Sequence, residues 1–189
     1  MKRLFIAIKI KETDELKKIF DDIRKNLSHE KIKWVESSNF HLTLIFLGNT
    51  DEKLISGISE LMDRITFKFE SYILSLVSVG VFKSIKVPNA IWLGIKKIRT
   101  MDEIKADIDR AMKDLGFIVE DREFKPHLTI GRPKNISDKY NLRQIIEKYK
   151  DKKIGDQLIE EIILYESILT PVGPIYKALH RSNFRNIHT

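Results

Sequence analysis

Residues 40–44 read FHLTL, and residues 126–130 read PHLTI. Each stretch holds a histidine and a threonine two positions apart, and 86 residues separate the two histidines. Short alternation of apolar and polar residues is typical of a strand with one buried face, and residues i and i+2 of a strand point to the same side. We therefore predict two strands, each with its histidine and threonine on one face and its aliphatic residues in a core.

The repeated residue types suit the chemistry of a phosphate ester. One of the two imidazoles, His41 or His127, could take a proton from water while the other gives a proton to a leaving oxygen, since a pKa of about 6.5 populates both forms near neutrality. The hydroxyls of Thr43 and Thr129 could donate hydrogen bonds to the phosphate oxygens. Arg132, directly beyond the second strand, could bind the phosphate through its guanidinium.

Each of these residues has a structural alternative. A single histidine in an apolar strand is more often packed in the core, threonine is a common strand residue, and Arg132 could be a surface arginine. The repetition favours the catalytic interpretation for the histidines. A zinc site needs three or four ligands, and neither strand offers a carboxylate or a second histidine two residues away. We predict no metal and no cofactor. Core packing is the more common role of four aromatic residues that could stack on a base: Phe5, Trp34, Phe82 and Tyr176.

Composition limits the class of protein. The chain has 189 residues, 42% of them hydrophobic and 32% charged, which fits one compact domain over residues 1–189. The absence of cysteine excludes disulfides and thiolate catalysis. A net charge of +7 favours an anionic partner, although lysine and glutamate alternate along the expected helices as on a solvated surface. The longest apolar stretch, 73–82, falls short of the ~18 residues of a membrane span. We expect a cytoplasmic protein without a membrane partner.

The expected strands and helices are mixed along the chain. Strands are expected at residues 3–9, 41–47 (ended by Gly48), 72–79, 90–95, 127–131, 158–169 and 175–179, and helices at residues 14–26, 51–65, 101–115 and 140–149. Strands joined by apparent hairpins indicate an α+β fold with antiparallel sheet rather than a doubly wound parallel sheet. Neither GxGxxG nor GxxxxGK[ST] occurs, which disfavours hydrolysis of nucleoside triphosphates.

The paired tetrads resemble those of the 2H phosphoesterase superfamily, and the flanking sequence resembles the RNA 2′,3′-cyclic phosphodiesterase family, formerly called 2′-5′ RNA ligases. The flanking similarity covers residues 3–7, 34–48, 126–132 and 167–176, so it extends over nearly the whole chain. One departure is Ile130, where the family often has leucine.

The resemblance implies a bilobal α+β fold of two antiparallel sheets with outer helices, related by a pseudo-twofold, with one tetrad per lobe and the active cleft between the lobes. It implies metal-free hydrolysis of RNA 2′,3′-cyclic phosphate ends to 2′-phosphomonoesters. His41 would be the proton donor to the 3′ oxygen and His127 the proton acceptor from water, with Thr43 and Thr129 on the phosphate. The reverse step would be 2′-5′ RNA ligation.

The expected partners are RNA termini, tRNA-like or other, or nucleotide cyclic phosphates, and we expect a monomer. Two alternatives stay open. One is a noncatalytic RNA-end binding module that uses its positive charge and its aromatic residues. The other is a phosphodiesterase that acts on small nucleotide cyclic phosphates.

Overall fold

The computed structural model describes residues 1–120, 123–171 and 173–186 of the chain. These residues form two antiparallel sheets and four α-helices, which confirms the predicted α+β class. The four-stranded sheet has the order β3-β1-β8-β9, with strands β1 (Lys2–Lys9), β3 (His41–Thr50), β8 (Glu161–Leu169) and β9 (Pro174–Asn183). The five-stranded sheet has the order β2-β6-β5-β4-β7, with strands β2 (Lys31–Trp34), β4 (Tyr72–Phe82), β5 (Ala90–Ile95), β6 (His127–Asn135) and β7 (Lys153–Ile159).

The two sheets repeat one arrangement around the two tetrads. In each sheet the tetrad strand, β3 or β6, pairs with one neighbour, β1 or β5, and two further antiparallel strands follow. The strand β2 is an addition on the outer edge of β6. The duplication seen in the sequence therefore has a counterpart in the order of the strands.

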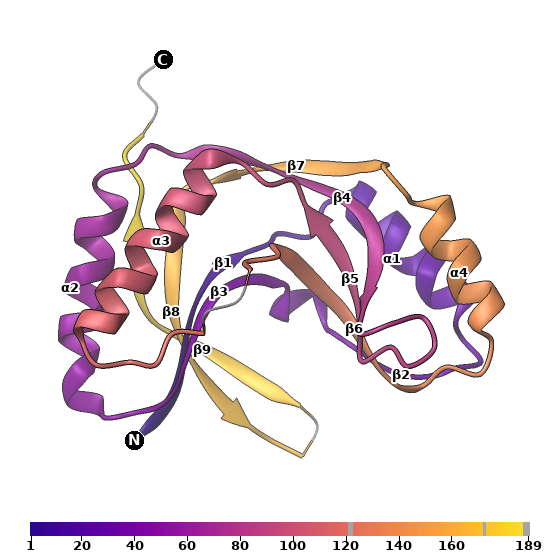
Figure 1. The fold of residues 1–189 in the computed structure, drawn as a ribbon, viewed down its shortest axis with the longest axis horizontal. Coiled ribbons are helices and arrows are strands. Elements are labelled where there is room, and N and C mark those ends of the chain that lie inside the picture. The colour runs from indigo at the N-terminus through magenta and orange to yellow at the C-terminus, as the bar shows by residue number, and fades with distance from the viewer. Residues whose placement is uncertain (121–122, 172, 187–189) are drawn as a thin grey trace.

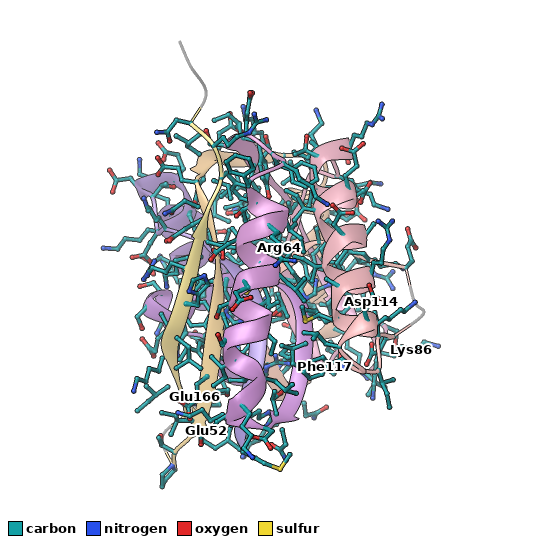
Figure 2. The ribbon with its side chains drawn as sticks, turned by 90° about the vertical axis from the view of Figure 1, so that its left-hand side faces the viewer. Glu52, Arg64, Lys86, Asp114, Phe117 and Glu166 are labelled. Atoms are coloured by element: carbon teal, nitrogen blue, oxygen red, sulfur yellow. The ribbon has the colours of Figure 1, made fainter. Side chains whose placement is uncertain are left out.

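Helices cover one face of each sheet. The helices α2 (Ile55–Thr66) and α3 (Arg99–Asp114) pack on the four-stranded sheet, and α1 (Asp14–Asn26) and α4 (Lys139–Lys148) pack on the five-stranded sheet (Figure 1). Figure 2 shows α2 and α3 side by side. No helix among the described residues is long and apolar enough to span a bilayer.

The alternation of each tetrad decides which side chains reach the core. Leu42, Leu128 and Ile130 have no solvent-exposed area, and Leu44 has almost none. These four side chains belong to the core cluster that also holds the buried faces of the helices. Because side chains alternate along a strand, the histidine and the threonine of each tetrad lie on the opposite face. The predicted orientation of both tetrads is thereby confirmed.

Several element boundaries differ from the sequence prediction, and β6 and β9 each extend beyond the expected strand, to Asn135 and Asn183. The strand β3 continues through Gly48, which has a positive φ of 68° at a register irregularity opposite Leu4, and ends at Thr50. The single strand expected at residues 158–169 is two strands in different sheets, β7 and β8, separated at Glu160. The short strand β2 was not predicted at all. Val172, in the expected turn between β8 and β9, lies outside the described residues.

Candidate active site

His41 is the first residue of β3 and follows the short 3-10 helix η1 (Ser37–Asn39). Its Nδ1 lies 2.7 Å from the main-chain carbonyl oxygen of Asn39. A carbonyl oxygen only accepts, so Nδ1 must carry the hydrogen and donate it. In the neutral ring this leaves Nε2 as the basic nitrogen, which is the atom that can exchange a proton with a substrate.

His127 is the first residue of β6 and is held in the same way. Its Nδ1 donates to the main-chain carbonyl of Lys125, also at 2.7 Å and also two residues earlier. The preceding residues match too, since Phe40 accepts from the amide of Ile10 and Pro126 accepts from the amide of Ile95, each at 3.1 Å. Both imidazoles are therefore fixed in the same tautomer by equivalent local structure.

Aromatic side chains pack against both rings. The ring of His41 lies 5.2 Å from that of Phe5 and 5.1 Å from that of Tyr176, the latter edge to face. The ring of His127 lies 4.6 Å from that of Phe82, also edge to face. These contacts limit the rotation of each imidazole and exclude water from one side of it. Three of the four aromatic residues that could stack on a base, Phe5, Phe82 and Tyr176, thus pack against the histidines.

Trp34 has a different position from the other three aromatic residues. Its ring meets that of Phe20 on α1 edge to face, with centroids 5.7 Å apart. It packs against the core cluster on the helix side of the five-stranded sheet. Core packing is therefore the role that the structure assigns to Trp34.

The two threonines sit beside the histidines with their hydroxyls available. Thr43 and Thr129 are both partly exposed, and neither hydroxyl makes a hydrogen bond within the described part of the chain. The hydroxyls of Thr50 and Thr66 instead donate to main-chain carbonyls. The structural alternative for Thr43 and Thr129, a bond to neighbouring backbone, does not occur, so both hydroxyls can bond a ligand.

Electrostatic effects at His41 indicate which groups surround it. The pKa of His41 is lowered to about 4, chiefly by burial and also by the positive charges of Lys9, Arg132 and His127, against the opposing effect of the hydrogen bond to the carbonyl of Asn39. Arg132 and His127 belong to the five-stranded sheet, whereas His41 and Lys9 belong to the other. The two tetrads therefore act on one another across the space between the sheets.

Arg132 also reaches a second residue of the opposite sheet. Burial raises the pKa of Tyr176 on β9, while the charge of Arg132 acts to lower it. The guanidinium is exposed at a position three residues beyond Thr129. Arg132 thus adds positive charge to the space that both tetrads face, as a phosphate-binding residue would.

A pocket of about 230 Å³ opens beside His41 and is lined by Lys9, Asn39, Tyr165, Tyr176 and Arg181, among others. A wider surface hollow of about 530 Å³ lies at the start of α3 and contains no histidine. The pocket beside His41 includes one of the two imidazoles, whereas His127 lines neither hollow.

The sequence did not predict that Lys9 and Asn39 support the site. Lys9 donates its ammonium protons to the main-chain carbonyl of Ser38 and, at 3.5 Å, to that of Ser37, which holds η1 in place. The side-chain amide of Asn39 donates to the carbonyl of Pro174 at 3.2 Å and so ties η1 to β9. Every residue has a carbonyl, so neither set of bonds could be read from residue types.

No group of three or more histidine, aspartate or glutamate side chains that could hold a metal ion occurs among the described residues. The metal-free mechanism stays a prediction, which a chelator can test.

Two antiparallel sheets that each present a histidine and a threonine to a shared space define a phosphoesterase of the 2H type. The family model described as LigT like Phosphoesterase matches residues 8–92 and residues 94–176, and each match contains one tetrad. The chain belongs to this LigT-like phosphoesterase family.

Relatives and solved structures agree with this family. The chain is 38% identical over 177 residues to the RNA 2′,3′-cyclic phosphodiesterase of Methanocaldococcus jannaschii, covering 94% of this chain and 98% of that protein. It is 34% identical over 178 residues to the protein of that name from Archaeoglobus fulgidus, covering 94% and 97%. The crystal structure of Escherichia coli LigT complexed with 3′-AMP superposes with a TM-score of 0.76 at 24% identity, covering 97% and 98%.

Proposed function

We propose that this protein hydrolyses 2′,3′-cyclic phosphates at RNA ends to 2′-phosphomonoesters. The observation that carries the proposal is the matched pair of imidazoles, each fixed with Nδ1 as a donor to the carbonyl two residues earlier. Two such groups on facing sheets suit an acid and a base acting on one phosphorus atom. The relatives named RNA 2′,3′-cyclic phosphodiesterase support the substrate class.

The proposed step breaks the bond between phosphorus and the 3′ oxygen. A water oxygen attacks phosphorus, and Nε2 of His127 takes a proton from that water. The 3′ oxygen leaves and receives a proton from Nε2 of His41, which gives a 3′ hydroxyl and a 2′-phosphomonoester. The hydroxyls of Thr43 and Thr129 donate to the nonbridging oxygens, where negative charge increases in the transition state. Arg132 adds a fixed positive charge.

The donor role of His41 requires a change of protonation on binding. With a pKa lowered to about 4, its ring is neutral near pH 7 in the ligand-free protein. A bound cyclic phosphate brings a negative charge beside the ring, and an opposite charge favours the protonated form. We propose that His41 takes up a proton when the substrate binds and then gives it to the 3′ oxygen.

A second candidate function is hydrolysis of small nucleotide cyclic phosphates. It is favoured by the pocket of about 230 Å³ beside His41, which is small and has tyrosines on its wall. The E. coli relative is known in complex with 3′-AMP, which is a mononucleotide. His41, Thr43, His127 and Thr129 would act in the same way on an RNA end and on a small nucleotide. The reverse of the reaction on an RNA end would be 2′-5′ ligation. We propose a cytoplasmic monomer for either function.

The test is incubation with an RNA oligomer that ends in a 2′,3′-cyclic phosphate, with the monoester product identified. The wild type is expected to release only the 2′-phosphomonoester, and EDTA is expected to leave the rate unchanged. His41→Ala and His127→Ala should each lower kcat by at least about 100-fold, since general acid–base catalysis contributes about that much or more. The control His29→Ala removes a half-exposed imidazole elsewhere and should leave kcat unchanged.

Two results would overturn the proposal. Turnover that persists in both alanine variants would remove the two-histidine mechanism. A wild type that binds the oligomer tightly but never opens the cyclic phosphate would favour the noncatalytic RNA-end binding module.

A further inference from the structure

Four cationic side chains lie beyond the second tetrad, on the face of the five-stranded sheet that carries His127 and Thr129. Arg132 and Lys134 on β6 are exposed, while the intervening Pro133 is buried. On the neighbouring β2, Lys31 and Lys33 are exposed, whereas Ile32 and Trp34 pack against the core. Lys33 and Arg132 stand opposite one another in the register of the two strands. We call Lys31, Lys33, Arg132 and Lys134 the cationic ribbon.

The ribbon faces the same space as the catalytic residues. Arg132 acts electrostatically on His41 and on Tyr176, both of which belong to the opposite sheet. The Nζ atom of Lys33 lies 3.7 Å from the place that a Cβ of Gly173 would occupy, at the turn between β8 and β9. The hairpin of β8 and β9 extends away from the rest of its sheet in Figure 1. The ribbon therefore leads from the tetrads toward the turn at the tip of this hairpin.

The charge of the ribbon is not neutralised by any carboxylate among the described residues. None of its four members pairs with a carboxylate in the described part of the chain. Lysines elsewhere do, such as Lys68 with Asp107 at 2.9 Å. Four adjacent positive charges without partners repel one another, and a polyanion laid along them would relieve that repulsion.

We propose that the cationic ribbon binds the backbone phosphates of the RNA strand that carries the cyclic end, so that the preferred substrate is an oligonucleotide and not a mononucleotide. This inference rests on the proposed function. A 2′,3′-cyclic phosphate is the 3′ terminus of its chain, so every other nucleotide lies on its 5′ side. From Thr129 to Lys134 the strand extends for about 16 Å at ~3.3 Å per residue, which is enough for several nucleotides.

The test compares two substrates: a decamer with a 5′ fluorescein and a 3′-terminal 2′,3′-cyclic phosphate, and adenosine 2′,3′-cyclic phosphate. The ribbon variant is Lys31→Gln/Lys33→Gln/Lys134→Gln, which leaves Arg132 in place. We expect its kcat/KM for the decamer to fall by at least about tenfold, with the mononucleotide rate unchanged. The slope of the logarithm of the decamer binding constant against the logarithm of the salt concentration should become shallower by about 2, because each phosphate contact on a single strand contributes ~0.7 to this slope.

The control variant removes the same charge from the outer helices. Lys17, Lys18 and Lys113 are exposed on α1 and α3 and have no ion pair in the described structure, so their triple glutamine variant matches the loss of three charges. The inference would be overturned if the kcat/KM of the ribbon variant for the decamer stayed within twofold of the kcat/KM of the control variant. Wild-type rates on the mononucleotide that equal those on the decamer would do the same.

A binding measurement separates the inference from the proposed function. Fluorescence anisotropy with the same decamer ending in a 2′-phosphate needs no turnover. If the wild type hydrolyses neither substrate, the proposed function fails, and the ribbon is still judged by the difference in anisotropy between the two variants. If the wild type hydrolyses both substrates and the two variants bind the decamer equally, only the ribbon is wrong.

Discussion

The depressed pKa of His41 makes the stability of the ligand-free protein depend on pH. The pKa falls from 6.5 to about 4 on folding, chiefly because the ring is buried and then because positive charges surround it. Above pH 6.5 the ring is neutral in both the folded and the unfolded chain. As the pH falls below 6.5 the unfolded chain binds a proton first, so folding stability is lost progressively until the folded ring also titrates near pH 4.

The loss of folding stability can be calculated from the change in the pKa of His41. One pKa unit corresponds to 1.36 kcal/mol, so a fall from 6.5 to about 4 removes about 3 kcal/mol of stability between pH 7 and pH 4. His41→Asn removes the titrating group and keeps a side-chain amide that can donate to the carbonyl of Asn39. Carboxylates also titrate in this range, but they are the same in both proteins and cancel in the comparison.

The assay is urea unfolding at pH 7 and at pH 4 for the wild type and for His41→Asn. The wild type should lose about 3 kcal/mol more than the variant between the two pH values. His29→Asn reports the effect of removing an exposed imidazole. Equal losses in the wild type and His41→Asn, or a His41 ring that titrates near 6.5 by NMR, would show that the ring is not buried among positive charges.

Three further predictions concern the support of the site. Asn39→Ala removes the hydrogen bond that the Asn39 side-chain amide donates to the carbonyl of Pro174, so η1 should loosen and kcat should fall by about tenfold while the protein stays folded; an unchanged kcat would show that this hydrogen bond does not position His41. Thr129→Val should lower kcat by about 100-fold through loss of one donor to the phosphate, and a rise in KM alone would argue against a role in the transition state. Gly80→Ala would place a Cβ against the indole of Trp92, so urea unfolding should show a loss of about 1 to 3 kcal/mol, and an unchanged midpoint would mean that the ring moves freely.

The parts of the fold that follow local rules were predictable from the sequence. Alternation within a strand is a property of neighbouring residues, so the burial of Leu42 and Leu128 followed from the tetrads alone. The helix α1 begins and ends where its apolar spacing predicted, and Thr13 caps it by accepting from the amide of Leu16 at 3.2 Å. Both features depend only on residues close together in the chain.

The remaining features depend on contacts between distant residues. The chain passes from one sheet to the other at Glu160, whose carbonyl accepts from the amide of Phe184 at 2.7 Å, and no local pattern distinguishes this from one continuous strand. The strand β2 has only four residues and exists because it pairs with β6. The pKa of His41 is lowered chiefly by burial and also by the charge of Arg132, a residue of the other sheet. The change of sheet, the strand β2 and the lowered pKa of His41 therefore all depend on tertiary structure.

The proposed catalysis requires both imidazoles to act on one phosphate. NMR titration of the protein with 2′-AMP, a product of the proposed reaction on a cyclic mononucleotide, tests this directly by following the rings of His41 and His127 together. We predict that both sets of ring signals move with a single common Kd and that the pKa of His41 rises well above 4 in the complex. Movement of one ring alone, or of the two rings with different Kd values, would contradict a shared phosphate.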